Sequence, residues 1–154
     1  MRYSGLQVVF QEIPNEISLA IHVVGCPLRC PGCHSSDLWP TNKGTDLDEQ
    51  NFSQLITNHK KYISCVLFMG GEWHSQELLS LIHNAKLHGL KTALYSGYEL
   101  SQIPKELLNE LDYIKYGRYI AERGGLSSII TNQNLINLKT NENLNHYFTE
   151  GVRK

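Results

Sequence analysis

The 154-residue chain lacks the features that mark membrane, secreted and strongly charged proteins. It has no apolar run near the ~20 residues that span a bilayer. Its first twelve residues, with one basic side chain and a short apolar patch, do not resemble a signal peptide. Fourteen basic residues nearly balance fifteen acidic ones, for a net charge of −1. We therefore expect a cytoplasmic protein without general affinity for membranes or nucleic acids.

Internal repeats, low-complexity tracts and linkers are also lacking. Apolar residues make up 41% of the chain and charged residues 19%, which excludes disorder, collagen and coiled coil as descriptions of the whole. The length is typical of one domain, so we expect a single domain over residues 1–154.

Strand-like and helix-like segments alternate along the chain. The pattern predicts strands at 18–24, 63–69, 91–96, 112–116 and 134–138, and helices at 46–60, 75–88 and 104–110. Asp46 is expected to cap the first helix. Such alternation favours right-handed crossovers and parallel pairing. A closed (β/α) barrel needs ~200 residues, so we expect an α/β fold, a partial (open) β/α barrel of about five mostly parallel strands.

Cysteines are few, and three of the four are crowded together. Cys26, Cys30 and Cys33 share a loop with two prolines and a glycine, whereas Cys65 lies alone in an apolar strand and is expected in the core. Disulfides are rare in the cytosol. Three clustered thiols therefore indicate a metal centre, directly after the first predicted strand.

Three interpretations of the cysteine loop compete. Inert buried thiols have no packing reason to gather in a polar loop. Structural zinc takes four ligands, but there is no second Cys-x-x-Cys, and His34 is adjacent to Cys33, a poor spacing for the same ion. A four-iron cluster with three cysteine ligands would leave one iron open to a substrate, and we favour this interpretation.

Two motifs together carry a family resemblance. The pattern Cys-x3-Cys-x2-Cys resembles the signature of radical S-adenosylmethionine (SAM) enzymes, and Gly70-Gly71-Glu72 follows the second predicted strand, where that superfamily has its Gly-Gly-Glu motif. The resemblance implies that the three cysteines bind a 4Fe-4S cluster and that Gly70, Gly71 and Glu72 hold the methionine end of SAM. Glycines allow the close backbone approach that this requires.

Further matches narrow the resemblance. Gly32 stands where an aromatic residue is common, and Trp73 stands where proline is common. Cys-Pro-Gly-Cys followed by His34 resembles the activating protein of the anaerobic (class III) ribonucleoside-triphosphate reductase. Similar stretches cover most of the chain: Asp37-Leu38-Trp39, then residues 95–100, 116–119, 125–128 and 132–133.

This resemblance implies a defined reaction. The reduced cluster passes one electron to SAM, the C–S bond breaks, and methionine and a 5′-deoxyadenosyl radical form. The radical takes hydrogen from a backbone glycine of the large reductase subunit and leaves a glycyl radical. The implied partners are this subunit and a low-potential electron donor; a homodimer and a heterotetramer with the reductase are both compatible.

Further SAM contacts and rival functions stay open. Gly32 and His34, beside the cluster, are expected to touch SAM; Ser96 is expected to reach its ribose, although a turn hydroxyl explains Ser96 equally well.

One rival function is that of an activase of another glycyl radical enzyme, such as pyruvate formate-lyase. Another is a radical SAM enzyme acting on a small molecule. A third is no enzyme but an iron–sulfur electron carrier or zinc-binding module, which would not bind SAM.

Overall fold

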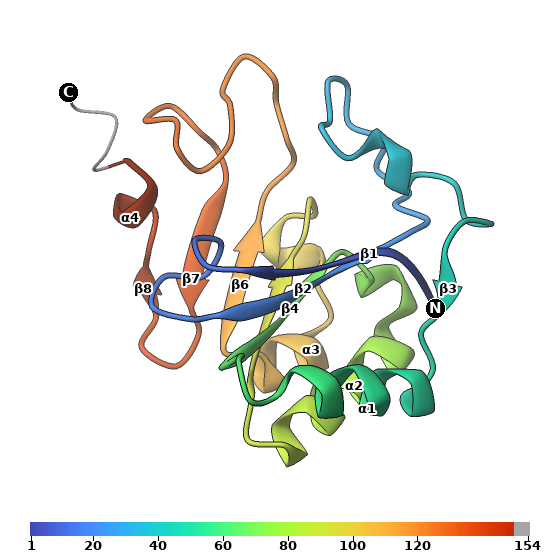
Figure 1. The fold of residues 1–154 in the computed structure, drawn as a ribbon. Helices are drawn as coiled ribbons and strands as arrows, with labels where there is room; N and C mark the ends of the chain where they lie inside the picture. The colour runs from blue at the N-terminus through green and yellow to red at the C-terminus, as the bar shows by residue number, and fades with distance from the viewer. Residues whose placement is uncertain (150–154) are drawn as a thin grey trace.

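A computed structural model describes residues 1–149 and shows an open sheet of eight strands (Figure 1). The strands are β1 (Arg2–Val9), β2 (Ser18–Val23), β3 (Thr45–Asp46), β4 (Cys65–Met69), β5 (Lys91–Tyr95), β6 (Tyr113–Tyr116), β7 (Asn134–Asn137) and β8 (Glu142–Asn143). The helices are α1 (Glu49–His59), α2 (Ser75–Leu87), α3 (Lys105–Glu110) and α4 (His146–Thr149). Over this part of the chain, no helix combines the length and the apolar character needed to cross a membrane.

The centre of the sheet is parallel and its flanks are antiparallel. The strand order is β3-β1-β2-β4-β5-β6-β7-β8, and β2, β4, β5 and β6 pair in parallel. On either side, β1 runs antiparallel to β2, and β7 runs antiparallel to β6. Four parallel strands joined by helices align their carboxyl ends along one edge, which is where the candidate site lies.

The sheet contains three strands that the sequence pattern did not predict. β3 and β8 have two residues each, too few for a periodic signal. β1 mixes polar and apolar residues irregularly and has a register shift near Gly5. The sheet thus has eight strands, of which four pair in parallel, whereas the sequence pattern predicted about five mostly parallel strands. The sheet is not closed, and its description as a partial β/α barrel stays a prediction.

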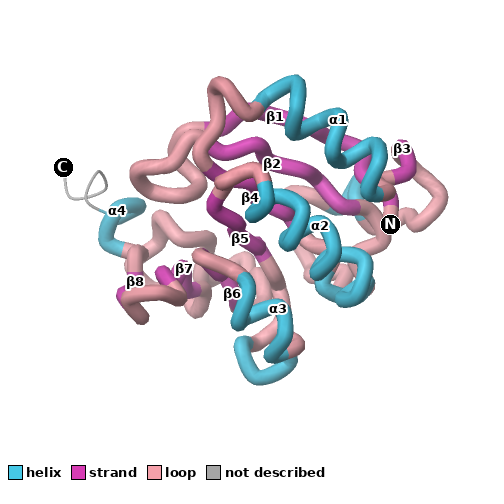
Figure 2. Tube along the Cα trace, turned by 90° about the horizontal axis from the view of Figure 1, so that it is seen from below, coloured by secondary structure: helices cyan, strands magenta, loops and turns pink. Residues whose placement is uncertain are grey.

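Helices α1, α2 and α3 cover one face of the sheet (Figure 2). Phe52 of α1 stacks on Phe68 of β4, with ring centroids 5.9 Å apart, and both side chains are fully buried. Asp48 caps α1 by accepting a hydrogen bond from the Asn51 amide at 2.8 Å, so the expected cap at Asp46 was wrong by two residues. This packing makes the helix-covered face the main hydrophobic core.

The other face of the sheet carries a smaller apolar cluster. Ala20, Cys65, Leu67, Ala93 and Leu135 are its fully buried members on the strands. Cys65 lies in this core as expected, and burial raises the pKa of its thiol to about 12. Towards the carboxyl ends of the strands, the same face carries the partly buried side chains that wall the cavities described below.

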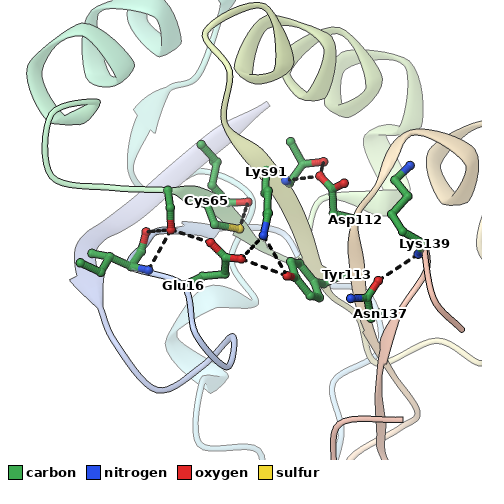
Figure 3. A network of polar contacts seen from close by, with 11 residues as sticks. Glu16, Cys65, Lys91, Asp112, Tyr113, Asn137 and Lys139 are labelled. Atoms are coloured by element: carbon green, nitrogen blue, oxygen red, sulfur yellow. Dashed lines mark hydrogen bonds and ion pairs between the residues drawn. The ribbon is translucent and has the colours of Figure 1, made fainter. Parts of the chain in front are cut away.

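A buried carboxylate organises the opposite end of the sheet (Figure 3). Glu16 is 7% exposed and accepts hydrogen bonds from Lys91, from Ser64 Oγ at 2.6 Å and from Tyr113 Oη at 3.0 Å. Burial by itself would raise the pKa of Glu16, but the hydrogen bonds, led by that of Lys91, hold it below its ordinary value. The network ties the β1–β2 connection to the amino ends of the parallel strands.

We predict that Lys91→Met lowers the free energy of unfolding by about 1–2 kcal/mol at pH 7, a value that is modest because the Lys91 side chain is half exposed. The folded-state pKa of Glu16 lies below its ordinary 4.5, so this stabilisation is present above pH 4.5 and is lost as the pH falls through the folded-state pKa. Urea unfolding of wild type and variant at several pH values measures the difference.

The exposed Lys105→Met in α3 is the matched control and should change stability little. A Lys91→Met variant as stable as this control at pH 7, or a difference that persists unchanged in acid, would contradict the account of the network.

Candidate metal centre

The cysteine loop leaves β2 and is held in place by its own backbone. The Gly25 amide donates to the Leu38 carbonyl at 2.7 Å, which closes the loop at its base. Inside it, the Cys33 amide donates to the Cys30 carbonyl at 3.1 Å. Cys30 is buried, and Cys26 and Cys33 are partly buried. The loop is therefore a compact, folded-back segment that holds three thiols close to the sheet edge.

All three cysteines line one cavity of about 160 Å³. Three of the predicted SAM-site residues, Gly70, Glu72 and Ser96, line the same cavity. These residues are separated widely in the sequence but follow β2, β4 and β5, which are neighbours in the sheet. The parallel core thus brings together both sequence motifs at one edge.

The other three predicted site residues do not line this cavity. Gly71 is buried, and an added Cβ there would lie 3.4 Å from the Val23 side chain. Gly32 and His34 are exposed, and the His34 ring lies 5.6 Å from that of Tyr119. Contacts of these three residues with SAM stay predictions.

The turn after β4 requires glycine for two reasons. Gly70 and Gly71 have φ values of +88° and +110°, which side chains rarely tolerate. A Cβ on Gly70 would also lie 2.7 Å from the ring of Trp73. This turn therefore keeps the backbone bare beside the cavity, with Trp73 packed directly on it.

Glu72 is a buried carboxyl with one free oxygen. Its side chain is 6% exposed, and Oε1 accepts a hydrogen bond from Ser96 Oγ. No partner for Oε2 exists among the described residues. Burial raises the pKa of Glu72 above its ordinary value. The Ser96 hydroxyl is already engaged in holding this carboxyl and in accepting the Tyr98 amide at 3.0 Å.

Lys115 is a cavity residue that sequence analysis missed. It lies in β6, lines the cavity and stands 5.7 Å from the ring centroid of Tyr95, its neighbour on β5. Among residues 1–149, the Lys115 ammonium has no hydrogen-bond partner and no carboxylate oxygen within the 4.0 Å of an ion pair. Burial lowers the pKa of Lys115 to about 8. Strand alternation, which puts Lys115 on the same face as Tyr113, was the available signal.

Trp73 adds a further polar group without a partner to the cavity wall. Its indole Nε1 is buried and lacks a partner in the described part of the chain. Buried polar groups normally find partners, so orphaned atoms of Glu72 and Trp73 around one cavity indicate a polar ligand.

The loop between β6 and β7 packs over the cysteine loop. Arg118 donates to the Leu28 carbonyl at 3.0 Å, and an added Cβ on Gly32 would lie 3.4 Å from Ala121. The loop is closed at its base, where the Gln133 side chain donates to the Gly117 carbonyl at 3.0 Å. Arg118 thus contacts the cysteine loop itself.

Comparison with known families gives the class of the site. Residues 17–136 match the family described as a 4Fe-4S single cluster domain, and the chain belongs to this family. No curated protein matches the chain at a significant level. The match covers the cysteine loop, the Gly-Gly-Glu turn and all four parallel strands.

The residues present fit such a cluster. Three thiols line one cavity, and within residues 1–149 no three or more Cys, His, Asp or Glu side chains are grouped closely enough to hold one metal ion. A 4Fe-4S cluster spreads its ligands over separate iron atoms, which suits more widely spaced thiols. Cys26, Cys30 and Cys33 are therefore the residues that would hold it.

We predict that anaerobic reconstitution with iron and sulfide gives about four irons per wild-type chain. Cys26→Ala, Cys30→Ala and Cys33→Ala should each lose most of the iron and of the absorbance near 400 nm, because each removes one of only three thiolates. Iron analysis and absorption spectra measure the loss.

Cys65→Ala is the matched control, since Cys65 is fully buried in the apolar cluster and away from the cavity. Equal iron loss in Cys65→Ala, or full iron in all three loop variants, would show that the assignment of ligands is wrong.

Proposed function

We propose that this iron–sulfur protein is a radical SAM activase that forms a glycyl radical on the anaerobic ribonucleoside-triphosphate reductase. One observation supports it above all: the cavity lined by the three cysteines also holds the Glu72 carboxyl, whose Oε2 has no partner among the described residues, and the amine of Lys115. A protein that only carried electrons would need neither group.

The charges in the cavity suit the amino-acid end of SAM. Glu72 Oε2 is an acceptor for an α-ammonium group, and the Lys115 ammonium is a donor for an α-carboxylate. The Trp73 indole N–H offers one further donor, and Gly70 allows the ligand to approach the backbone. A zwitterion would pair with both groups at once, which is favourable because a buried polar group without a hydrogen bond is costly.

When bound, the cluster and SAM would supply the electron transfer and the carbon–sulfur cleavage that produce a hydrogen-abstracting radical. The chain's own residues bind, orient and shield these groups. Ser96 fixes the Glu72 carboxyl, while Met69, Trp39 and Trp73 provide apolar walls that would shield a bound ligand from water. Water exclusion strengthens the polar contacts to the ligand and prevents loss of the radical.

The choice of substrate rests on the finer resemblance. The stretches around Gly32 and His34 and along the β6–β7 loop resemble the reductase activating protein, and the structure brings these two segments into contact. The substrate would be a backbone glycine of the large reductase subunit, and a low-potential donor would supply the electron.

We predict that Glu72→Gln weakens SAM binding by roughly 10–100-fold, because it removes the charge that faces the α-ammonium group. Ser96→Ala should weaken binding less, since it frees the carboxyl to move without removing its charge. Equilibrium dialysis of radiolabelled SAM against reconstituted protein measures both.

Glu106→Gln on α3 is the control, because Glu106 is exposed and lies outside the cavity. If Glu72→Gln binds SAM as tightly as this control, the proposed site for the methionine end of SAM is wrong.

The complete function is tested by electron paramagnetic resonance. An anaerobic mixture of reconstituted protein, a strong reductant, SAM and the large reductase subunit from the same source should develop a glycyl-radical doublet that requires every component. If 5′-deoxyadenosine forms without a doublet, the protein is a radical SAM enzyme, but the reductase is not its substrate. If neither forms, the activase proposal fails.

A further inference from the structure

A second cavity, of about 370 Å³, adjoins the first. Tyr95, Lys115 and Gln133 line both cavities, so the two share a wall on the helix-free face of the sheet. The remaining walls come from Gln11 and Glu12 after β1, from Leu126 and Ser127 in the β6–β7 loop, and from Phe148 of α4. A ligand in this second cavity would thus lie next to the cluster cavity.

Large exposed apolar side chains stand in the same three segments. Phe10 is 66% exposed beside Gln11; Ile129 and Ile130, which follow Ser127 in the β6–β7 loop, are 78% and 62% exposed; Tyr147 is 48% exposed beside Phe148. In Figure 1 the β1–β2 connection and α4 lie at the left of the view, and the β6–β7 loop rises above the sheet. We call Phe10, Ile129, Ile130 and Tyr147 the apolar rim.

Hydrogen bonds hold the segments that carry the apolar rim in place beside the cavity. The Tyr95 hydroxyl, in the shared wall, donates a hydrogen bond to the Glu12 carbonyl, two residues from Phe10. In the β6–β7 loop, Thr131 Oγ1 donates to the Gly124 carbonyl at 3.2 Å and keeps the segment that carries Ile129 and Ile130 folded. The exposed side chains therefore project from braced segments beside the cavity.

We propose that the apolar rim docks the polypeptide that carries the substrate glycine, and that a segment of this polypeptide enters the second cavity towards the cluster cavity. The inference rests on the proposed function, which requires a backbone to reach the site. A cavity floor with Gln11, Glu12, Ser127 and Gln133 offers the donors and acceptors that an extended backbone needs. Exposed apolar groups around such a floor are typical of protein–protein contacts, where a few large side chains carry most of the affinity.

The experiment compares Phe10→Ser and the double variant Ile129→Ser/Ile130→Ser with Leu87→Ser. Leu87 is 87% exposed at the end of α2, on the helix-covered face, and is the matched control. Affinity for the large reductase subunit is measured by sedimentation velocity under anaerobic conditions with reconstituted protein and without SAM. Glycyl-radical yield and 5′-deoxyadenosine formation without the reductase are then measured on reconstituted protein.

We expect the rim variants to bind the reductase about tenfold or more weakly and to lose radical yield at limiting reductase, while the Leu87 variant matches wild type. None of the rim residues lines the cluster cavity, so SAM cleavage without reductase should continue in these variants. Circular dichroism checks that each variant is folded.

Rim variants that bind the reductase as tightly as wild type would overturn the docking surface, even if wild type cleaves SAM normally. If the wild-type chain is a dimer and the rim variants are monomers, the rim is a self-association surface, and the proposed docking of the reductase is wrong. If the wild-type protein binds the reductase through the rim but cleaves no SAM, the docking surface is supported and the proposed function is wrong.

Discussion

Parallel pairing of β2, β4, β5 and β6 is the constraint on which the site depends. It fixes the carboxyl ends of four strands at one edge, so that the cysteine loop, the Gly-Gly-Glu turn, Ser96 and Lys115 meet although up to 89 residues separate them. The helices on one face and the Glu16 network at the opposite edge hold this pairing in place. The chemistry thus lies at the edge of the sheet, while stability comes from the helix-covered core and the far edge.

Two titratable groups of opposite charge give the cluster cavity its character. Glu72 is buried and has an orphaned oxygen and a raised pKa, whereas the partly buried Lys115 has a lowered pKa and lies close enough to Glu72, Cys30 and Cys33 to feel their charges. Buried polar groups without a hydrogen bond destabilise a fold, and they are commonly tolerated where a ligand completes them. Binding of a zwitterion would therefore stabilise the folded chain and also orient the ligand, which links affinity for SAM to stability.

The sequence predicted the motifs and the parallel core better than the flanks of the sheet. Long apolar strands such as 63–69 carry strong signals, and the cysteine spacing and Gly70-Gly71-Glu72 are specific local patterns. The two-residue strands β3 and β8 have no such signal, because tertiary pairing alone creates them. Lys115 lies within the predicted strand 112–116, and strand alternation places it on the face of Tyr113, but no motif marked it as a site residue. Gly32 and His34 were expected at the ligand because they adjoin the cysteines; both are exposed beside Tyr119, and their contacts with SAM stay predictions.

The central claim is that SAM binds beside an iron–sulfur cluster in the cavity that Glu72 and Lys115 line. The most direct measurement is the electron paramagnetic resonance spectrum of the reduced, reconstituted protein before and after SAM is added. The account predicts that SAM changes the cluster signal in wild type, and that Lys115→Met requires a much higher SAM concentration for the same change. A cluster signal that SAM leaves unchanged in wild type would contradict the account and leave a simple electron carrier.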